Sequence, residues 1–267
     1  MQPARKSALA IGAHPDDMEF LCAGTLALLE ERGFEITIAS MSPGDLGSSS
    51  LDRDAIARVR REEAAHAAAM VSARYVCVEA GDFNIFFGDE LCRRVTALLR
   101  SVRPNLVFTH ARSDYLADHE ETSRIVAQAC FAAPVPNYRT PGTFEDSDRP
   151  TPSIPHLYYC DPVELTDLHG RRVPASVYVD VRSTIDLKER MLACHESQRE
   201  WLRRHHHTDE YLESMLRWSA ARGSEIKVPY AEGFQQHRGH AFPQDCLLSS
   251  TLGSLVRAPA IEVGRKA

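Results

Sequence analysis

The segment "ALAIGAHPDDMEF", residues 8–20, places a short apolar run directly before His14, Pro15, Asp16 and Asp17. The apolar run predicts a buried strand, and the residues after it predict a turn that leads into a helix. Adjacent carboxylates repel each other unless a positive charge lies close to them. The segment therefore predicts a strand whose end carries a cation-binding turn.

The first half of the chain repeats this pattern of a short apolar strand followed by a helix. Strands are predicted at 8–12, 35–40, 75–80 and 105–110, and helices at 19–33, 53–72 and 89–102. Strands that alternate with helices are typical of βαβ units and a mainly parallel sheet. The sequence thus predicts an α/β, Rossmann-like three-layer fold, in which the common strand order 3-2-1-4-5 makes the first and fourth strands neighbours.

The second half of the chain differs in composition and in its pattern of apolar residues. Residues 133–155 are proline-rich and polar without a hydrophobic period, which predicts a long surface loop of the kind that forms lids or interfaces. Strands are predicted at 156–161 and 176–181, helices at 185–205 and 209–223, and an irregular segment at 230–243. We therefore expect one domain, residues 1–267, with a core at about 6–182 and a C-terminal elaboration at about 183–267.

Composition restricts the class of protein. The chain has 267 residues, of which 43% are hydrophobic and 25% charged, and these are ordinary values for a globular protein. The net charge is −6 and basic residues are scattered along the chain, which argues against nucleic acid as the main partner. No stretch reaches the roughly 18 uninterrupted apolar residues of a membrane span.

The N-terminus and the cysteines indicate the cellular compartment. The start, "MQPARKSALAIGA", has the basic residues and apolar run of a signal peptide, but the run is short and is better used as the first strand. The seven cysteines are widely spaced and never form a CxxC pair, so we interpret them as buried free thiols. These features predict a cytoplasmic protein.

Possible metal ligands are concentrated in the loops after the first and fourth strands. The first loop contains His14, Asp16 and Asp17, and the second, in "HARSDYLADHEETSRIV", contains His110, Asp114, Asp118 and His119. Ligands of doubly wound sheets bind where the strand order reverses, so these two loops are expected to face each other.

The spacing of these residues suggests separate tasks. His14 and Asp17 can converge on one ion across the turn, while Asp16 points toward a metal-bound water. Asp118 and Glu121 resemble a capping box, which places His119 in the first turn of a helix as the third ligand; His110 is the rival for that place. The alternative is that Asp16, Asp17 and Asp118 only cap helices.

At these residues the sequence resembles the zinc-dependent de-N-acetylase family named for PIG-L and LmbE. The matching motifs are "AHPDDME" (13–19) and "DYLADH" (114–119), and weaker matches are "RREEA" (60–64) and "VEAGDFNIF" (78–86). The resemblance covers at least residues 8–132 and implies a zinc ion held by His14, Asp17 and His119, with Asp16 as general base. It implies removal of acetyl groups from N-acetylglucosamine-type amino sugars and their conjugates.

The second motif departs from the family pattern. Many members have a histidine that stabilises the oxyanion where this chain has Leu116, and leucine cannot donate a hydrogen bond. The predicted replacements are His110, Tyr115, His237 and His240, of which we favour His240. Predicted substrate contacts are Arg60, Asp45, Asp82 and Tyr115, although Arg60 and Glu63 also have the spacing of a surface ion pair.

Two sets of residues in the C-terminal half receive structural interpretations. Trp201, Tyr211 and Trp218 have helical spacing and are predicted to lie in a core or interface. The charged stretch "RRHHHTDE" (203–210) is interpreted as a solvated helix terminus.

The sequence therefore predicts a zinc-dependent amide hydrolase that deacetylates a small-molecule amino sugar. The alternatives are a zinc-containing sugar-binding protein with weak catalysis, motivated by Leu116, and a zinc hydrolase of another amide or carbamoyl group. The resemblance also implies a homo-oligomer, a trimer or a hexamer.

Overall fold

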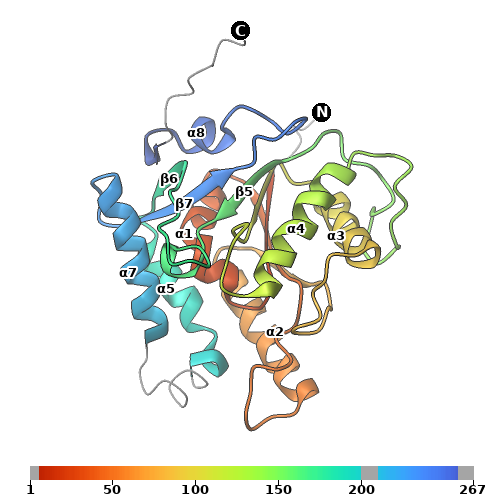
Figure 1. The fold of residues 1–267 in the computed structure, drawn as a ribbon, viewed down its shortest axis with the longest axis horizontal. Helices are drawn as coiled ribbons and strands as arrows, with labels where there is room; N and C mark the ends of the chain where they lie inside the picture. Colours follow the sequence, from red (N-terminus) through yellow and green to blue (C-terminus); the bar gives the residue numbers. More distant parts are fainter. Residues whose placement is uncertain (1–5, 200–209, 258–267) are drawn as a thin grey trace.

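The computed structural model describes residues 6–199 and 210–257, and its centre is one mixed β-sheet (Figure 1). Eight strands of the described residues pair in the order β3-β2-β1-β4-β5-β7-β6-β8. Their bounds are β1 Ser7–Gly12, β2 Glu35–Ser40, β3 Arg74–Cys77, β4 Leu106–Thr109, β5 His156–Cys160, β6 Val177–Asp180, β7 Ala231–Gln236 and β8 Val256–Arg257. The predicted α/β class is confirmed.

The first five strands are parallel and have the predicted order. β1 pairs with β2 on one side, where Ala10 aligns with Ile38, and with β4 on the other, where Ala10 aligns with Phe108. β1 is buried on both faces, because Ala8 and Ala10 belong to one apolar cluster and Leu9 and Ile11 to another. A strand buried on both faces has the continuous apolar sequence seen at 8–12.

The other end of the sheet is antiparallel, and the expectation of an irregular segment at 230–243 is wrong for its first part. β7 lies between β5 and β6 and is antiparallel to both. Its sequence, "AEGFQQ", lacks the alternation of a typical strand. The pairing of its backbone with two neighbours, rather than local propensity, determines its conformation.

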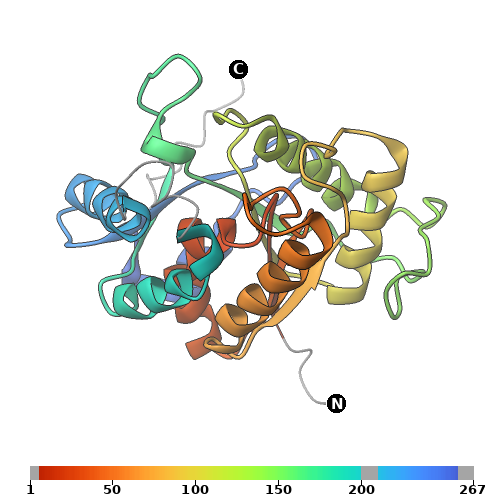
Figure 2. The same ribbon diagram turned by 90° about the horizontal axis from the view of Figure 1, so that it is seen from below.

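Helices cover both faces of the sheet (Figures 1 and 2). α3 and α4 pack on one face with Leu9 and Ile11, and α1, α5 and α8 pack on the other with Ala8 and Ala10. α2 contacts β3 and α5, and α7 contacts α5 and β7. The bounds are α1 Asp17–Glu31, α2 Arg53–Ala69, α3 Asp89–Val102, α4 Ala117–Ala132, α5 Ile185–Ala193, α7 Glu210–Glu225 and α8 Leu247–Leu252.

The predicted helix 185–205 is shorter in the structure. α5 ends at Ala193, Cys194 and His195 leave the helix, and residues 196–199 form a further helical turn. Residues 200–205, Trp201 among them, lie outside the described residues, as does most of "RRHHHTDE".

The proline-rich segment 133–155 contains neither helix nor strand, as predicted. It runs beside α3 and α4 (Figure 1) and is held there by Arg100, whose guanidinium donates to the carbonyls of Ala133 at 3.1 Å and Val135 at 2.7 Å. None of its residues lines the large cavity described below, so it is not a lid over that cavity.

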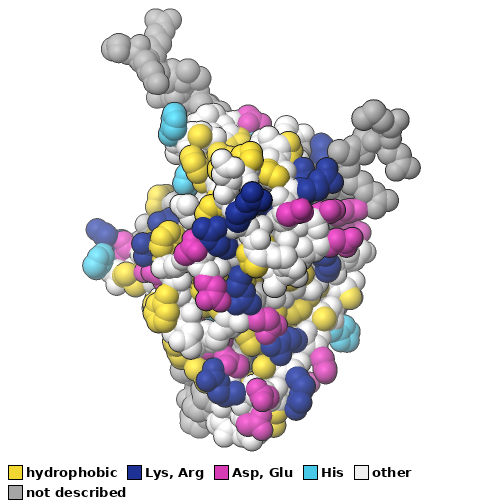
Figure 3. All heavy atoms as spheres, turned by 90° about the vertical axis from the view of Figure 1, so that its right-hand side faces the viewer, with side chains coloured by type: hydrophobic (Ala, Val, Ile, Leu, Met, Phe, Trp, Pro, Cys, Tyr) yellow, Lys and Arg dark blue, Asp and Glu magenta, His cyan; other side chains and the backbone are white. Residues whose placement is uncertain are grey.

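The surface and the cysteines show ordinary features. Basic and acidic side chains are intermixed over the face shown in Figure 3. All seven cysteines are free, as predicted, and four of them are buried: Cys22, Cys92, Cys130 and Cys160. Among the described residues, no helix is both long and apolar enough to cross a membrane.

Candidate metal centre and active site

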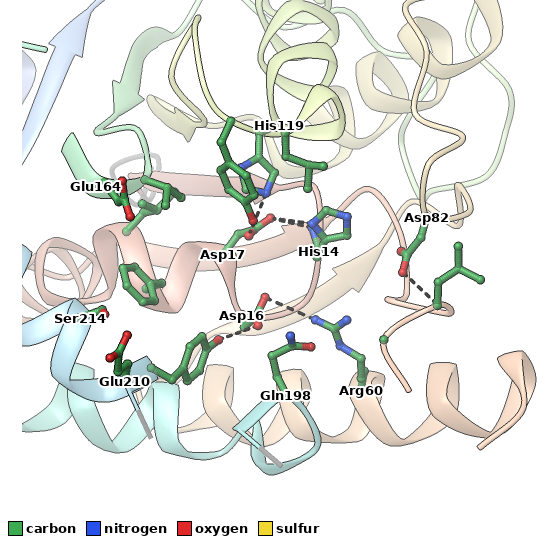
Figure 4. A pocket seen from close by; sticks show the side chains of 18 of the residues that line it. His14, Asp16, Asp17, Arg60, Asp82, His119, Glu164, Gln198, Glu210 and Ser214 are labelled. Atoms are coloured by element: carbon green, nitrogen blue, oxygen red, sulfur yellow. Dashed lines mark hydrogen bonds and ion pairs between the residues drawn. The ribbon is translucent and has the colours of Figure 1, made fainter. Parts of the chain in front are cut away.

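A cavity of about 710 Å³ opens where the strand order reverses, at the carboxyl ends of β1 and β4. The loops after β1 to β4 form one part of its wall, α1, α2, α4 and α7 form another, and Val163, Glu164 and Gln198 complete it. His14, Asp16, Asp17 and His119 all lie in this wall (Figure 4). The two ligand-rich loops thus face each other, as the sequence predicts.

The turn after β1 is tight. A Cβ atom at Gly12 would lie 2.6 Å from the Cβ of Asp17, so only glycine allows this close approach. Asp16 occupies the left-handed backbone region with φ 104°, which costs an L-residue about 1–3 kcal/mol. Asp16 stands at the N-cap position of α1, but its side chain makes no capping hydrogen bond. The helix-cap alternative for Asp16 is therefore wrong.

His14, Asp17 and His119 bring two imidazoles and one carboxylate together. A potential ligand atom of each lies within 4.8 Å of the others. Nδ1 of His14 is 3.6 Å from Oδ2 of Asp17, and Nε2 of His119 is 3.5 Å from Oδ1 of Asp17. The backbone N–H of His14 also donates to Oδ2 of Asp17 at 2.7 Å, which fixes the carboxylate in the turn.

Each of these imidazoles has a second carboxylate behind it. Nε2 of His14 lies 3.2 Å from Oδ2 of Asp118, and Nδ1 of His119 lies 3.1 Å from Oδ1 of Asp114. A carboxylate that accepts one ring N–H leaves the other ring nitrogen free as a metal ligand. The free atoms are then Nδ1 of His14 and Nε2 of His119, and both lie toward Asp17.

Contrary to the prediction of a capping box, the side chain of Asp118 does not cap α4. α4 begins at Ala117 after Leu116, and no side chain caps it. The carboxylate of Asp118 instead accepts the backbone N–H of Phe83 at 2.9 Å in addition to its contact with His14. His119 lies in the first turn of α4, as expected.

This donor set fits a zinc ion. Two imidazole nitrogens and a carboxylate oxygen are the protein ligands of many catalytic zinc sites, which leave a fourth position for water or substrate. His14, Asp17 and His119 line the cavity, so that position would be accessible from it. His110, Asp114 and His119 form a second possible group, but neither His110 nor Asp114 lines the cavity.

The local electrostatics favour a cation. Burial lowers the pKa of His14, but its hydrogen bonds to Asp118 and Asp17 outweigh this and raise the pKa to about 10. For Asp17, burial acts in the opposite direction and raises the pKa, but the imidazoles of His110 and His119 hold this pKa well below its usual value. The centre thus concentrates negative charge that a divalent ion would neutralise.

Asp16 has different partners from Asp17. Its Oδ2 accepts a hydrogen bond of 2.6 Å from the hydroxyl of Tyr211, and its Oδ1 lies 3.4 Å from the guanidinium of Arg60. Burial raises the pKa of this carboxyl group, while Arg60 opposes the shift. Asp16 therefore lies beside His14, Asp17 and His119 but is held by partners outside that group.

His110 lies behind the cavity wall. Its ring stacks on His119 with a centroid distance of 3.9 Å, and its Nε2 is 2.9 Å from Oδ2 of Asp17. Burial, together with the charge of His119, lowers its pKa. His110 thus positions Asp17 and has no access to a substrate in the cavity.

The predicted substrate contacts divide into two groups. Arg60, Asp82 and Tyr115 line the cavity, whereas Asp45 does not. Arg60 is buried and donates to the carbonyl of Pro15 at 2.7 Å, so the alternative of a surface ion pair with Glu63 is wrong. Asp45 instead pairs with Arg53 and accepts the backbone N–H of Asp82 at 2.9 Å.

Most of the predicted replacements for a histidine at Leu116 do not lie at the site. Leu116 itself lines the cavity, and of the candidates only Tyr115 does so as well. His240 follows β7 and is exposed. His237 packs against Phe242 and shares a hydrogen bond with the hydroxyl of Tyr159. The preference for His240 is therefore corrected, because its segment ends away from the cavity.

Sequence reasoning missed the wall formed by the C-terminal half. Tyr211 and Trp218 pack against Phe20 as predicted for core residues, but they also line the cavity. Glu164, Gln198, Glu210 and Ser214 lie there too (Figure 4). The available signal was the spacing of Tyr211 and Trp218, which places both on one face of a helix.

Comparisons with known proteins connect this geometry to a family. The family described as "PIG-L: GlcNAc-PI de-N-acetylase" matches residues 9–130, which contain the turn after β1 and the start of α4. The match to the PIG-L family covers slightly less than half of the 267 residues. The predicted resemblance is confirmed, and it includes both loops that supply the candidate ligands.

Relatives of the full chain include enzymes of two kinds. The 4-oxalmesaconate hydratase of Pseudomonas putida is 25% identical over 253 residues, which are 88% of this chain and 90% of the hydratase. The crystal structure of GalB, the 4-carboxy-2-hydroxymuconate hydratase of Pseudomonas putida, has a TM-score of 0.71 at 23% identity and covers 90% of this chain and 98% of that one.

The N,N'-diacetylchitobiose deacetylase of Pyrococcus horikoshii has a TM-score of 0.73 at 22% identity, covering 90% of this chain and 88% of the deacetylase. Both solved structures have the same fold as this chain. The relatives together support an enzymatic activity of the kind found in this family, a metal-dependent hydrolase or lyase.

Proposed function

We propose that this protein is a zinc-dependent hydrolase that removes the N-acetyl group from an N-acetylglucosamine-type amino sugar or its conjugate. The observation that carries the proposal is the convergence of His14, Asp17 and His119 in a cavity whose wall also holds Asp16, fixed by Tyr211 and Arg60. These are the parts that metal-assisted amide hydrolysis needs: a metal centre, a proton acceptor and space for a substrate.

In this proposal each residue has one task. His14, Asp17 and His119 hold the zinc ion, which when bound polarises the amide carbonyl and lowers the pKa of a water molecule. Asp16 accepts a proton from the attacking water as the new C–O bond forms. Asp16 then returns the proton to the nitrogen as the C–N bond breaks, so that acetate and a free amine leave.

We assign three substrate contacts in the cavity wall. Arg60 is a buried cation beside Asp16, and Asp82 is a buried carboxylate that faces the cavity from the loop after β3. Tyr115, whose ring lies edge-on to His119 at 5.4 Å, supplies a hydroxyl next to Leu116. Its hydroxyl can donate the hydrogen bond that Leu116 cannot.

The test is release of acetate from a panel of N-acetylated amino sugars. The protein is freed of metal with a chelator, reconstituted with one equivalent of zinc, and assayed in both states. We expect acetate release only from the zinc-loaded protein. Tight binding of the sugars without release would instead indicate a sugar-binding protein, and release of another acyl or carbamoyl group would change the assigned bond.

A hydratase is the second candidate, because the P. putida hydratase aligns with 88% of the chain. Its substrate is a polycarboxylate, which a cavity recognises with cationic side chains. Among the described residues that line this cavity, Arg60 is the only lysine or arginine, whereas Asp82, Glu164 and Glu210 add negative charge. This balance favours a neutral amino sugar. Hydration of 4-oxalmesaconate by the zinc-loaded protein, without acetate release from any sugar, would reverse the assignment.

A further inference from the structure

A buried polar pair that the proposed reaction does not use lies behind the cavity wall. His195, which follows α5, is fully buried, and Glu19, in the first turn of α1, is 1% exposed. Neither residue lines the cavity, so neither can touch a bound substrate. A role of this pair in the reaction must therefore act through another residue.

Polar atoms of this pair have no hydrogen bond. Among the residues that the structure describes, both ring nitrogens of His195 and Oε1 of Glu19 lack a hydrogen-bond partner. The nearest approach is between the two residues themselves, where Nε2 of His195 lies 3.6 Å from Oε1 of Glu19. Buried polar groups without partners destabilise a fold, so their presence points to a functional reason.

The two side chains are complementary in every protonation state. An imidazole always keeps at least one N–H donor, and a glutamate side chain always keeps at least one acceptor oxygen. A small shift of either side chain brings Nε2 of His195 and Oε1 of Glu19 from 3.6 Å to the length of a hydrogen bond. The contact therefore does not depend on the charge of either group.

The first turn of α1 links this pair to Asp16. The backbone carbonyl of Asp16 accepts the N–H of Phe20, the neighbour of Glu19, at 2.9 Å. Burial raises the pKa of Asp16, and the charges of Arg60 and His195 oppose this shift. The imidazole is thus close enough to act on the carboxylate of Asp16 as well as on Glu19.

α2 fixes both sides of this arrangement. Arg60 lies 3.4 Å from Oδ1 of Asp16 (Figure 4). One turn further along the helix, Glu63 accepts the backbone N–H of Ser197 at 2.9 Å and the hydroxyl of Ser197 at 2.6 Å. Two hydrogen bonds to one carboxylate hold the segment that contains His195 against α2. The spacing of Arg60 and Glu63 therefore serves two separate contacts.

We propose that His195 is a positioning residue for Asp16. Through its contact with Glu19 it fixes the first turn of α1 from behind, and so keeps the carboxylate of Asp16 in the place where it accepts a proton from water. The inference rests on the proposed function, in which Asp16 is the proton acceptor. Because His195 and Glu19 lie outside the cavity, their removal should lower kcat and leave KM and zinc affinity unchanged.

The decisive test is a double variant, His195→Leu with Glu19→Met, which replaces both polar side chains by apolar ones. Replacing a buried polar pair by packed apolar groups is often neutral for stability, so a merely structural role would be rescued. A positioning role is not rescued, and we expect kcat for acetate release to fall by about tenfold or more, with KM, zinc content and melting temperature near wild type. A wild-type kcat, or a raised KM at unchanged kcat, would overturn the proposal.

A pair of single variants tests the contact itself and serves also if the double variant folds poorly. His195→Gln keeps a side-chain N–H donor, whereas His195→Leu keeps none. Both are assayed at a temperature at which each is folded with one zinc ion bound. We expect the higher kcat in His195→Gln, and equal kcat values would show that the donor to Glu19 has no part in the reaction.

The matched control is another contact between a histidine and a carboxylate. Nε2 of His156 lies 3.0 Å from Oδ1 of Asp245, and His156 begins β5, at the end of the sheet opposite to the cavity. His156→Leu with Asp245→Leu should leave kcat at the wild-type level. A fall in kcat as large as that of the first double variant would reveal a general effect of removing such contacts and contradict the proposal.

A crystal structure of the zinc-loaded double variant at His195 and Glu19 keeps this inference separate from the proposed reaction. In the wild-type protein the hydroxyl of Tyr211 lies 2.6 Å from Oδ2 of Asp16. We expect this contact to lengthen beyond about 3.2 Å in the variant. If no acetate is released from any sugar, the proposed function fails, and this distance alone decides the positioning role: an unchanged contact overturns it.

Discussion

Asp16 and Asp17 are neighbours in sequence, but their side chains have separate environments. Asp17 is surrounded by imidazoles, with His110 at 2.9 Å, whereas Asp16 contacts Tyr211 and Arg60. Successive residues at the end of a strand and the start of a helix project in different directions, so adjacency does not imply a shared task. The left-handed backbone of Asp16 accompanies this divergence and is characteristic of functional sites.

Asp16→Asn is expected to reduce kcat by about 10²- to 10⁴-fold, because the amide cannot accept the proton from the attacking water. Zinc binding should persist at one ion per chain, since Asp16 is not in the predicted ligand set. Steady-state acetate release together with metal analysis measures both effects. Asp186→Asn, on the exposed side of α5, is the matched control and should behave as wild type. An Asp16→Asn variant that keeps more than about a tenth of the wild-type activity would contradict the role of Asp16 as proton acceptor.

Asp114→Asn is expected to weaken zinc affinity by about 10- to 100-fold, because Asp114 orients the imidazole of His119 through its Nδ1 and raises its basicity. Competition with a chromogenic chelator measures the affinity. Asp45→Asn removes a carboxylate of a neighbouring loop outside the cavity and serves as the control. Equal affinities in wild type and Asp114→Asn would show that the contact at 3.1 Å does not support the metal.

At the scale of elements, α7 brings residues from the C-terminal half to the turn after β1. α7 packs on α5 and on β7, and both of these elements belong to the same side of the molecule as α1. Tyr211 therefore reaches Asp16 across 195 positions of sequence. The turn after β1 is thus contacted by a helix outside residues 9–130, the part that matches the family.

Tyr211→Phe is expected to lower kcat by about 10- to 100-fold, because a hydrogen bond to a charged group contributes about 1.5–3 kcal/mol. KM for the monosaccharide should change much less, since the lost bond orients Asp16. The variant is assayed beside Tyr178→Phe, which removes a comparable bond of 2.7 Å to Glu225. Equal kcat values for the two variants would show that the contact with Asp16 has no part in catalysis.

At the scale of the whole molecule, the candidate metal centre joins segments far apart in the sequence. His14 and Asp17 follow β1, and His119 belongs to α4 after β4, so an ion bound by all three cross-links the two sides of the topological switch point. An ion that binds the folded chain and not the unfolded one stabilises the fold by mass action.

Zinc at about 100 times its dissociation constant is expected to stabilise the folded chain by about 2.7 kcal/mol. For a chain of this size the melting temperature should rise by about 5–10 °C over that of the chelated protein. Differential scanning calorimetry measures the shift. Calcium, which prefers a larger number of oxygen ligands, is the control and should give little change. Identical melting temperatures with zinc and with chelator would contradict a metal centre at this position.

The sequence predicted the elements whose local pattern and packing agree. Residues 8–12 and 35–40 became β1 and β2, and α3 has the predicted bounds of 89–102, because apolar periodicity and Pro104 leave few alternatives. The prediction failed at β7, where "AEGFQQ" has no period of its own, and at α5, where buried His195 follows the end of the helix. At both places contacts from distant segments outweigh local propensity.

The motif residues and the parallel half of the sheet were determined by the sequence itself, because a strand, a turn and a helix are specified by neighbours along the chain. The pairing order of those strands then brings His14, Asp17 and His119 together. Only the tertiary structure decided that Tyr211, Trp218 and Glu164 complete the cavity and that His240 does not, because these positions depend on how α7 and β7 pack against the core. Side-chain packing between remote segments has no periodic signal in one sequence, and that is the physical reason for the division.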